Sequence, residues 1–333
     1  MAFKVTDRSY FAIVKKQIHA LAVAGSFSES RVGEIDIIVS EMVSNLVKHA
    51  GGGQVLVKMV TDDPNGPAME LISMDDGPGM MDVTRMVADG VSTKNTLGHG
   101  LGSMKRLADI FQIYSQKDWG TLILARVYKE PLPHFIKPPT VEIRSLLVPK
   151  PGEEECGDGF FHTTQQEYIK LFLGDGLGHG PEAAKAVTMA GQAFLECEET
   201  DPVAIIRHIN ISVKKTRGLV GTAAIFDTRE RRWKICGVGN ISTRVNSVSG
   251  IKSYMAYNGI IGLNVPNTLN AQEIPYEKGQ QLIMCSDGLK TRWDPVRFTG
   301  IGRYDLTLLA GCLLKDFARY TDDMSAAVCK INN

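Results

Sequence analysis

The sequence predicts two domains of the α+β class, a two-layer α/β domain followed by a sheet-on-sheet domain flanked by helices. The chain has 333 residues, of which 44% are hydrophobic and 22% charged, so it has a globular composition and enough length for two domains. Residues 129–139 hold four of the 14 prolines and show neither helical nor strand periodicity. Strand-like runs become more frequent after this segment. We therefore expect domains at 1–128 and 141–333, joined by a proline-rich linker at 129–140.

In the first expected domain, apolar residues recur first at helical and then at strand spacing. The clearest stripe lies in residues 28–50, where apolar side chains recur every three or four positions. The predicted helices are at about 8–24, 28–50 and 101–109. The predicted strands are at about 54–61, 68–74, 110–115 and 121–127. This mixture is typical of one sheet with helices packed against it.

In the second expected domain, strand patterns outnumber helical ones. The predicted strands are at about 141–148, 159–164, 168–173, 221–226, 233–238, 242–245, 281–285 and 325–331. The predicted helices are at about 181–197, 202–214 and 305–320. Many strands with few helices indicate two packed sheets with helices outside them.

Charge and composition exclude some classes of partner. The formal net charge is zero and the pI is about 7.0, so we expect no nucleic-acid partner and no membrane surface as a partner. No apolar run approaches the roughly 20 residues that span a bilayer, and residues 1–7 lack the apolar core of a signal peptide. We therefore expect a cytoplasmic protein. The six cysteines form no CxxC pair and are expected to be reduced and mostly buried.

Four short acidic segments in the second half have the composition of a dispersed metal site. They are Cys156-Gly157-Asp158, Gly174-Asp175-Gly176, Ser286-Asp287-Gly288 and Asp322-Asp323. A lone Asp-Gly pair is most often a turn. Each of these segments, however, borders an apolar strand-like run, so a folded sheet can bring the carboxylates together. Carboxylate and backbone oxygens suit Mg²⁺ or Mn²⁺ better than zinc.

Phosphoester hydrolysis would give these acids distinct roles. Two divalent ions about 3.5 to 4 Å apart can activate a shared water, and they need a bridging carboxylate. Asp175 is the candidate bridge, because its two glycine neighbours let the backbone turn and present the Gly176 carbonyl as a further ligand. Asp287 and Asp322 would complete one metal site. Asp158 would contribute to the second, directly or through water.

In their order along the chain, these segments resemble the metal-dependent PPM phosphatases, and within them the SpoIIE-type branch. The resemblance covers roughly residues 141–331, and similarity to RsbX-like members rests on 216–218, 237–240 and 258–262. It implies an α-β-β-α sandwich that dephosphorylates phosphoserine or phosphothreonine by metal-activated water, with two Mn²⁺ or Mg²⁺ ions and Asp175, Asp287 and Asp322 in the catalytic centre.

The same resemblance addresses two ambiguous residues. Adjacent strand residues face opposite ways, so only one of Asp322 and Asp323 can be a primary ligand. The motif position in the resemblance favours Asp322. His179, which precedes a predicted helix, is expected to be structural rather than a proton donor.

Glu41 and Asn45 lie four residues apart on the predicted helix 28–50, so they share a neighbouring face. Taken alone, the pair indicates a solvated helix face. It is accompanied by Asp75–Gly79 after a strand and by Gly98–Gly102 at a helix start, where glycines allow phosphates to approach backbone N–H groups. Asn45 could then bind Mg²⁺ and Glu41 act as a base. The spacing at 98–105 excludes the P-loop and the dinucleotide fingerprint.

Together these residues resemble the GHKL ATPases, in the branch of small serine kinases and anti-sigma factors. Residues 41–50 match the N box, and 75–79 and 98–107 match the two glycine boxes, over about residues 1–128. The pattern of the glycine boxes is most similar to that of the RsbT-like switch kinases, with the anti-sigma kinases as the alternative. The resemblance implies a two-layer sandwich, with a mixed sheet and helices on one face, that binds ATP with Mg²⁺.

The GHKL resemblance also implies roles for single residues. Asp75 should accept a hydrogen bond from the adenine amino group, helped by Thr121 on the last strand, and Asp76 should be a turn residue. Residues 80–97, with Gly90, Ser92 and Thr93, would form a lid. The expected ATP-binding residues are Asn45, Asp75, Gly77, Gly79, Gly98, Gly100, Gly102 and Thr121.

These motifs lead to one leading functional hypothesis and two alternatives. The leading one joins a serine kinase to the phosphatase that reverses it, acting on a STAS-domain partner-switching protein. In the first alternative, the N-terminal half is a non-catalytic ATP-dependent module that binds a sigma factor or senses nucleotide. In the second, the C-terminal half is a scaffold without turnover, which the retained Asp158, Asp175, Asp287 and Asp322 disfavour.

Overall fold

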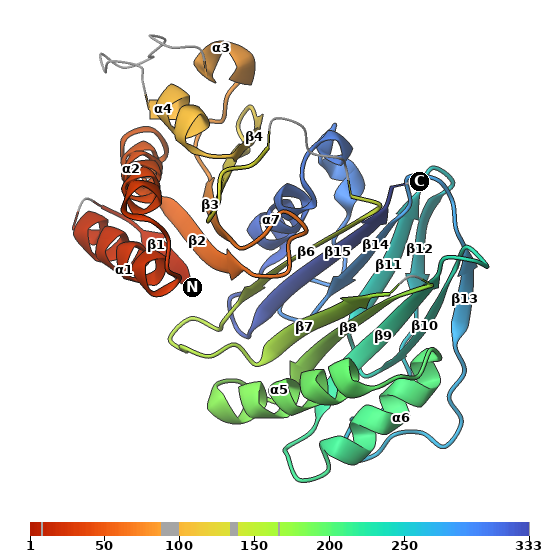
Figure 1. The fold of residues 1–333 in the computed structure, drawn as a ribbon. Coiled ribbons are helices and arrows are strands. Elements are labelled where there is room, and N and C mark those ends of the chain that lie inside the picture. Colours follow the sequence, from red (N-terminus) through yellow and green to blue (C-terminus); the bar gives the residue numbers. More distant parts are fainter. Residues whose placement is uncertain (8, 88–99, 134–138, 166, 333) are drawn as a thin grey trace. The chain divides into compact units, whose positions relative to one another are not determined.

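The computed structural model describes residues 1–7, 9–87, 100–133, 139–165 and 167–332 and divides into two compact units. Unit 1 comprises Met1–Pro138 together with Thr299–Gly311, and unit 2 comprises Pro139–Phe298 together with Cys312–Asn333. Figure 1 shows the elements of both units along the chain. The segment Thr299–Gly311 lies within the range 141–333 that the sequence assigns to the second domain, yet its contacts group it with unit 1.

Unit 1 is built on a five-stranded sheet with the order β1-β2-β3-β5-β4. The strands are β1 Ala2–Val5, β2 Gly53–Val60, β3 Ala68–Asp75, β4 Ile110–Gln116 and β5 Gly120–Tyr128. The helices are α1 Tyr10–Ala24, α2 Glu29–Asn45, α3 Val83–Val87 and α4 Gly100–Leu107. A π-helical turn, Leu46–Ala50, continues α2 to Gly51, which ends it in the left-handed conformation at φ 73°.

The pairings of this sheet correct one detail of the expected fold. Every described pairing, β1 with β2, β2 with β3, β3 with β5 and β4 with β5, is antiparallel, whereas a mixed sheet was predicted. The reason lies in the hairpin between β4 and β5. Its short turn reverses the chain, so β5 enters the sheet beside β3 in the opposite direction and no parallel crossover is needed.

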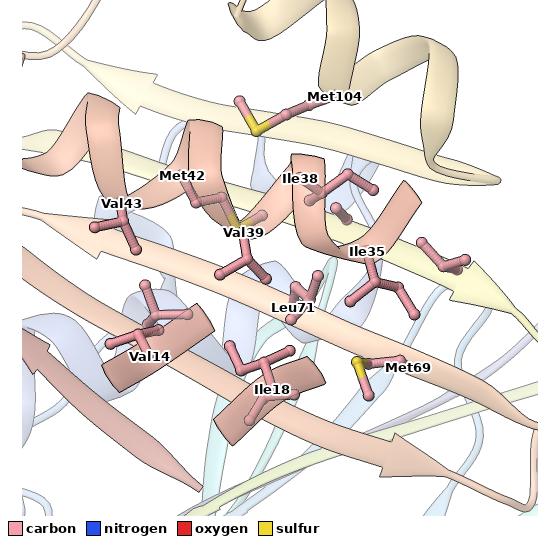
Figure 2. Close-up of a cluster of buried hydrophobic side chains, with 14 of the residues drawn as sticks. Val14, Ile18, Ile35, Ile38, Val39, Met42, Val43, Met69, Leu71 and Met104 are labelled. Atoms are coloured by element: carbon pink, nitrogen blue, oxygen red, sulfur yellow. The ribbon is translucent and has the colours of Figure 1, made fainter. Parts of the chain in front are cut away.

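Helices α1, α2 and α4 cover one face of the sheet, as the predicted two-layer sandwich requires. Figure 2 shows Val14 and Ile18 of α1 below the α2 stripe, with Met69 and Leu71 of β3 beneath and Met104 of α4 above. The stripe side chains recur at helical spacing and the strand side chains at every second position. Burial of each such side chain contributes about 1.5–3 kcal/mol.

The opposite face of the unit 1 sheet carries a buried ion network that involves the segment Thr299–Gly311. Arg126 on β5 is fully buried and pairs with Glu70 on β3, which is also buried. Its Nη1 donates to Asp305 Oδ2 at 3.0 Å. Thr307 Oγ1 donates to Glu70 Oε2 at 3.2 Å. These polar contacts join Asp305 and Thr307 to the unit 1 sheet, in agreement with the grouping of this late segment with unit 1.

Unit 2 contains two five-stranded sheets, with the orders β13-β10-β9-β8-β7 and β12-β11-β14-β15-β6, and all of their described ladder pairings are antiparallel. The strands of the first sheet are β7 Asp158–Thr164, β8 Tyr168–Gly176, β9 Leu219–Asp227, β10 Arg232–Val238 and β13 Gln272–Pro275. Those of the second are β6 Val141–Val148, β11 Ser242–Ser247, β12 Gly250–Tyr254, β14 Gln281–Cys285 and β15 Met324–Ile331.

The layers of unit 2 confirm the predicted α-β-β-α sandwich. Helices α5 Pro181–Glu196 and α6 Pro202–Ser212 cover the outer face of the first sheet (Figure 1). Helix α7 Leu306–Phe317 precedes β15, and its part from Cys312 onward belongs to unit 2. One apolar core lies under α5 and α6, and another fills the space between the sheets. Two short 3₁₀ helices, Pro295–Arg297 and Ile301–Arg303, precede α7.

Most elements match their predicted ranges, and the differences have local causes. Strands β1, β12 and β13 were not predicted, because each is short and lies at the edge of its sheet. Strand β8 extends to Gly176, so Asp175 lies inside a strand rather than after one. All six cysteines are free, and all but Cys156 are buried. Among the described residues, no helix is both long and apolar enough to cross a membrane.

Candidate functional site

Two of the predicted metal ligands face each other across neighbouring strands. In the β7–β8 ladder, Asp158 is the direct partner of Asp175, and Val220 of β9 pairs with Asp175 on its other side. Side chains alternate along a strand, so Asp175 shares a face with Leu171 and Leu173. Both of these leucines lie in the core between the sheets. The two carboxylates therefore occupy the inter-sheet face at one end of the sandwich.

The other acidic segments come from adjacent strands of the second sheet. Asp287 follows the end of β14, and Asp322 and Asp323 precede the start of β15. Because β14 and β15 are antiparallel neighbours, the end of β14 and the start of β15 lie at the same end of the sheet. A Cβ on Gly288 would lie 1.9 Å from the backbone oxygen of Asp323, so only glycine allows the two turns to pack this closely.

Asp158 is one of the deeply buried acids of this group. It is 5% exposed, and its Oδ2 accepts a hydrogen bond from the Ser286 hydroxyl at 2.6 Å. Among the described residues, its Oδ1 has no hydrogen-bond partner. The pKa of Asp158 is raised to about 7, mainly by burial. The hydroxyls of Ser286 and Ser325 oppose this rise, and the charges of Asp323 and Asp287 contribute to it. A buried carboxylate with one free oxygen is an unfavourable arrangement unless a cation approaches.

Asp175 also has a strongly raised pKa. Burial is the largest cause, and together with the charges of Asp158, Asp287, Asp322 and Asp323, in that order, it raises the pKa to about 9. All four other acids therefore lie within electrostatic range of Asp175. Repulsion of this kind between carboxylates favours the binding of a cation.

Asp322 and Asp323 differ in their surroundings. Asp323 is 2% exposed, its Oδ1 accepts from the backbone N–H of Lys150 at 2.9 Å, and burial raises its pKa. Asp322 is half-buried, and its Oδ1 accepts from the N–H of Asp323 at 2.9 Å. Asp323 thus also has a structural role between β6 and β15. The choice of Asp322 as the primary ligand stays a prediction.

Several residues around the acids were not given a role by the sequence. Asn240 donates through Nδ2 to Asp287 Oδ2 at 2.8 Å, and Ser286 and Lys150 contact Asp158 and Asp323 as described above. Serine before Asp287 at the end of a buried strand was the only available signal. His179 pairs through Nδ1 with Glu153 Oε1 at 2.6 Å, and no hydrogen bond within the described residues joins it to the candidate ligands.

The donor set fits hard divalent cations in its chemistry. All side-chain candidates are carboxylates, and Asp158 Oδ1 is an orphaned buried oxygen. Gly176 is needed at its position, because a Cβ there would lie 2.5 Å from the Ala183 oxygen, and its carbonyl stays the predicted backbone ligand. Within the described ranges, no group of three or more His, Cys, Asp or Glu side chains is already arranged around one ion position. Binding would therefore draw the carboxylates together.

Unit 1 brings the predicted ATP-site residues of α2 next to the start of α4. A Cβ on Gly100 would lie 2.6 Å from Glu41 Oε2 and 3.8 Å from Asn45 Oδ1. The glycine at this position lets α4 approach both side chains. Glu41 and Asn45, four residues apart on α2, thus face the same helix start, as their spacing predicts. Gly102, also on α4, is buried.

The first glycine box forms a compact turn at the end of β3. Asp75 Oδ1 accepts from the N–H of Gly77 at 2.8 Å and from that of Thr121 at 3.2 Å. A Cβ on Gly79 would lie 1.9 Å from the Gln116 oxygen, so this turn packs directly on the β4–β5 hairpin. Asp75, Gly77, Gly79 and Thr121 are therefore together. Gly98 and the lid residues Gly90, Ser92 and Thr93 lie outside the described residues.

Two protein-family models match this chain, one in its N-terminal half and one in its C-terminal half. Residues 6–127 match the histidine kinase-like ATPase domain, and residues 165–300 match the family of Stage II sporulation protein E (SpoIIE). The serine/threonine-protein kinase RsbT of Bacillus subtilis (strain 168) is 37% identical over 91 residues, 27% of this chain and 68% of RsbT. The phosphoserine phosphatase RsbX of the same strain is 28% identical over 141 residues, 42% of this chain and 70% of RsbX.

Solved structures with a similar fold include two that superpose over more than half of the chain. One comes from a study of the bacterial stressosome, described there as a modular system that has been adapted to control secondary messenger signalling. It has a TM-score of 0.55 at 29% sequence identity, and the match covers 57% of this chain and 100% of that chain. RsbX in complex with magnesium has a TM-score of 0.52 at 22% identity and covers 59% of this chain and 98% of its own. The latter likeness shows the fold alone.

Proposed function

We propose that this chain is both a switch-protein serine kinase and the phosphatase that opposes it. Its N-terminal half belongs to the RsbT-like histidine kinase-like ATPase domains, and its C-terminal half belongs to the SpoIIE family of PPM phosphatases. The observation that carries the phosphatase half is the gathering of five acids at one end of unit 2, with Asp175 in electrostatic range of the other four.

In the phosphatase, the chain's own residues bind and orient. Asp175, Asp287 and Asp322, with the Gly176 carbonyl, would hold one Mn²⁺ or Mg²⁺ ion, and Asp175 and Asp158 would hold a second. When bound, such ions supply an activated water and offset the charge of the phosphoryl oxygens. Asn240 holds Asp287 through a 2.8 Å hydrogen bond.

In unit 1, the adjacency of Glu41, Asn45 and Gly100 supports a kinase site for ATP and Mg²⁺. Asn45 would bind the Mg²⁺ ion through its carbonyl. Glu41 would accept the proton of the substrate hydroxyl as it attacks the terminal phosphoryl group of ATP. Asp75, with Thr121, would recognise the adenine, and the glycines of both boxes would let the nucleotide approach the backbone.

The proposed substrate of both activities is a serine of a STAS-domain protein. The relatives RsbT and RsbX are a serine/threonine-protein kinase and a phosphoserine phosphatase, so one phosphorylated serine would satisfy both halves. The kinase moves a phosphoryl group from ATP to the serine hydroxyl, and the phosphatase moves it from serine to water. The sum of the two steps is hydrolysis of ATP, so partner binding or nucleotide state must favour one of them.

Two single-site variants test this function on one STAS protein. Glu41→Gln should bind ATP, fail to phosphorylate the protein and still dephosphorylate its phosphorylated form. Asp175→Asn should show the reverse pattern. ATP binding without transfer in the wild type would instead favour a non-catalytic ATP-dependent binding module, and unimpaired transfer in Glu41→Gln would show that Glu41 is not the base. Activities of the two halves on unrelated substrates would overturn the opposition between them.

A further inference from the structure

One buried hydroxyl joins three strands at the acidic end of unit 2. Ser286 follows β14 directly and is 1% exposed. Its backbone N–H donates to the Ser325 oxygen at 3.2 Å, and its Oγ accepts from the Ser325 N–H at 3.0 Å. The same Oγ donates to Asp158 Oδ2 at 2.6 Å. Ser286 therefore connects the ends of β14, β15 and β7.

The hydrogen-bond directions of this hydroxyl are determined by its neighbours. A serine hydroxyl has one proton to donate, and a backbone N–H can only donate. Because the Ser325 N–H occupies a lone pair of Oγ, the Ser286 proton points to the Asp158 carboxylate. This bond is short, buried and directed at a charged acceptor, which places it among the stronger hydrogen bonds of proteins.

The bond leaves the two oxygens of Asp158 in different situations. Oδ2 accepts from Ser286, whereas Oδ1 is buried and has no hydrogen-bond partner among the described residues. An unsatisfied buried carboxylate oxygen is costly, so Oδ1 is suited to accept a cation. Mutation of a residue that hydrogen-bonds to a metal-binding carboxylate typically lowers the metal affinity or the activity 10- to 100-fold.

We propose that Ser286 is a positioning residue for the second metal ion of the phosphatase site. It engages Oδ2 of Asp158 and thereby presents Oδ1 as a direct metal ligand, rather than a ligand that acts through water. This inference rests on the proposed phosphatase function, and it adds a residue and an oxygen to which no role has been given.

The test is Mn²⁺ binding to the full chain, followed by electron paramagnetic resonance of the free ion. Ser286→Ala should weaken binding of one Mn²⁺ by about tenfold or more and leave the other site nearly unchanged. The matched control is Thr243→Val on β11 of the same sheet. Thr243 is 2% exposed, and its hydroxyl has no hydrogen-bond partner in the described part of the chain. This control should keep both affinities.

The outcomes separate the inference from the function on which it rests. If the wild type binds no Mn²⁺, the proposed phosphatase function fails. If the wild type binds two ions and folded Ser286→Ala binds both with the same affinity, the positioning role alone is overturned. Should Ser286→Ala not fold, Ser286→Thr carries the test, because it keeps the donor and must keep both affinities. A tenfold loss in folded Ser286→Thr would contradict the proposal.

Discussion

At the scale of single residues, the proposed phosphatase site consists of carboxyl groups in a buried environment where their ionisation is unfavourable. Asp158 and Asp175 sit in a buried environment with raised pKa values of about 7 and about 9. A raised pKa means that the folded chain binds the proton more tightly than the unfolded chain does. Without a cation, these carboxylates therefore reduce the free energy of unfolding once they ionise.

The first prediction concerns the pH dependence of metal-free stability. The pKa of Asp175 rises from 3.8 to about 9, so its destabilising contribution grows as pH increases between these values. The maximum slope for one proton is about 1.4 kcal/mol per pH unit. In EDTA, urea unfolding should give a lower free energy of unfolding for the wild type at pH 8 than at pH 5.5. Asp175→Asn should reduce this difference. If the free energy of unfolding changed equally between pH 5.5 and pH 8 in both proteins, ionisation of Asp175 would not destabilise the folded chain.

The sequence identified the acids but not what holds them. The four Asp-containing segments were recognisable because each borders an apolar run and carries a glycine or a second acid. The hydrogen bonds of Ser286, Asn240 and the Lys150 backbone depend on strand ends that are far apart along the chain. Spacing along one strand contains no information about such partners. The choice between Asp322 and Asp323 had the same limit.

At the scale of elements, close approach of turns builds both candidate sites. Gly288 and Gly79 each pack on backbone oxygens at distances that no other residue permits. The strands and helices that deliver these turns were largely predictable, because their apolar side chains recur at periods of about 3.6 and 2. The π-helical turn Leu46–Ala50 was predicted as part of a continuous helix, since its side-chain pattern does not differ from that of α2.

The second prediction tests the packing of the Asp287 turn. In Gly288→Ala, the added Cβ would overlap the Asp323 backbone oxygen at 1.9 Å, so one of the two turns must move. Overpacking of this kind costs about 1–3 kcal/mol or more. Thermal unfolding of the full chain should show a lower melting temperature together with weaker Mn²⁺ binding.

The control for this prediction is Gly33→Ala in the exposed part of α2. A Cβ there meets nothing within 4 Å. Alanine should stabilise the helix by roughly 0.5–1 kcal/mol, because glycine costs more backbone entropy. Unchanged stability and metal binding in Gly288→Ala would show that the two turns are not tightly packed.

At the scale of the whole molecule, sequence order and spatial units do not coincide. The segment Thr299–Gly311 lies between Asp287 and Asp322 along the chain, yet it completes unit 1. Its Asp305 also donates its backbone N–H to Gln112 Oε1 at 2.8 Å, and Tyr304 packs edge-on against Tyr114 with the ring centres 5.5 Å apart. The linker at 129–140 stays a prediction. The return of a late segment was not foreseen from the sequence, because it depends on partners 179 to 237 residues away along the chain.

The third prediction tests the buried charges that hold this segment. Burial lowers the pKa of Arg126, but the charges of Glu70 and Asp305 outweigh it and keep the guanidinium ionised. Arg126→Met removes the cation and leaves Glu70 buried without its partner, which should reduce the free energy of unfolding of unit 1 by about 3–5 kcal/mol. Urea unfolding followed by circular dichroism would measure this change.

The double variant Arg126→Met/Glu70→Leu serves as the comparison for the third prediction. It replaces both charges by apolar groups of similar size, so it should recover most of the lost stability. A double variant as unstable as Arg126→Met would mean that Arg126 acts through its packing rather than through its charge.

The central claim is that the acids of unit 2 hold the cations of a phosphoserine phosphatase. The most direct measurement is phosphate release from a phosphoserine peptide by the full chain, with Mn²⁺ and with EDTA, for the wild type and for Asp175→Asn. We predict Mn²⁺-dependent release by the wild type and at least a 100-fold lower rate for folded Asp175→Asn, because the ligand shared by both ions is lost. Undiminished release by Asp175→Asn, or release that persists in EDTA, would contradict the account.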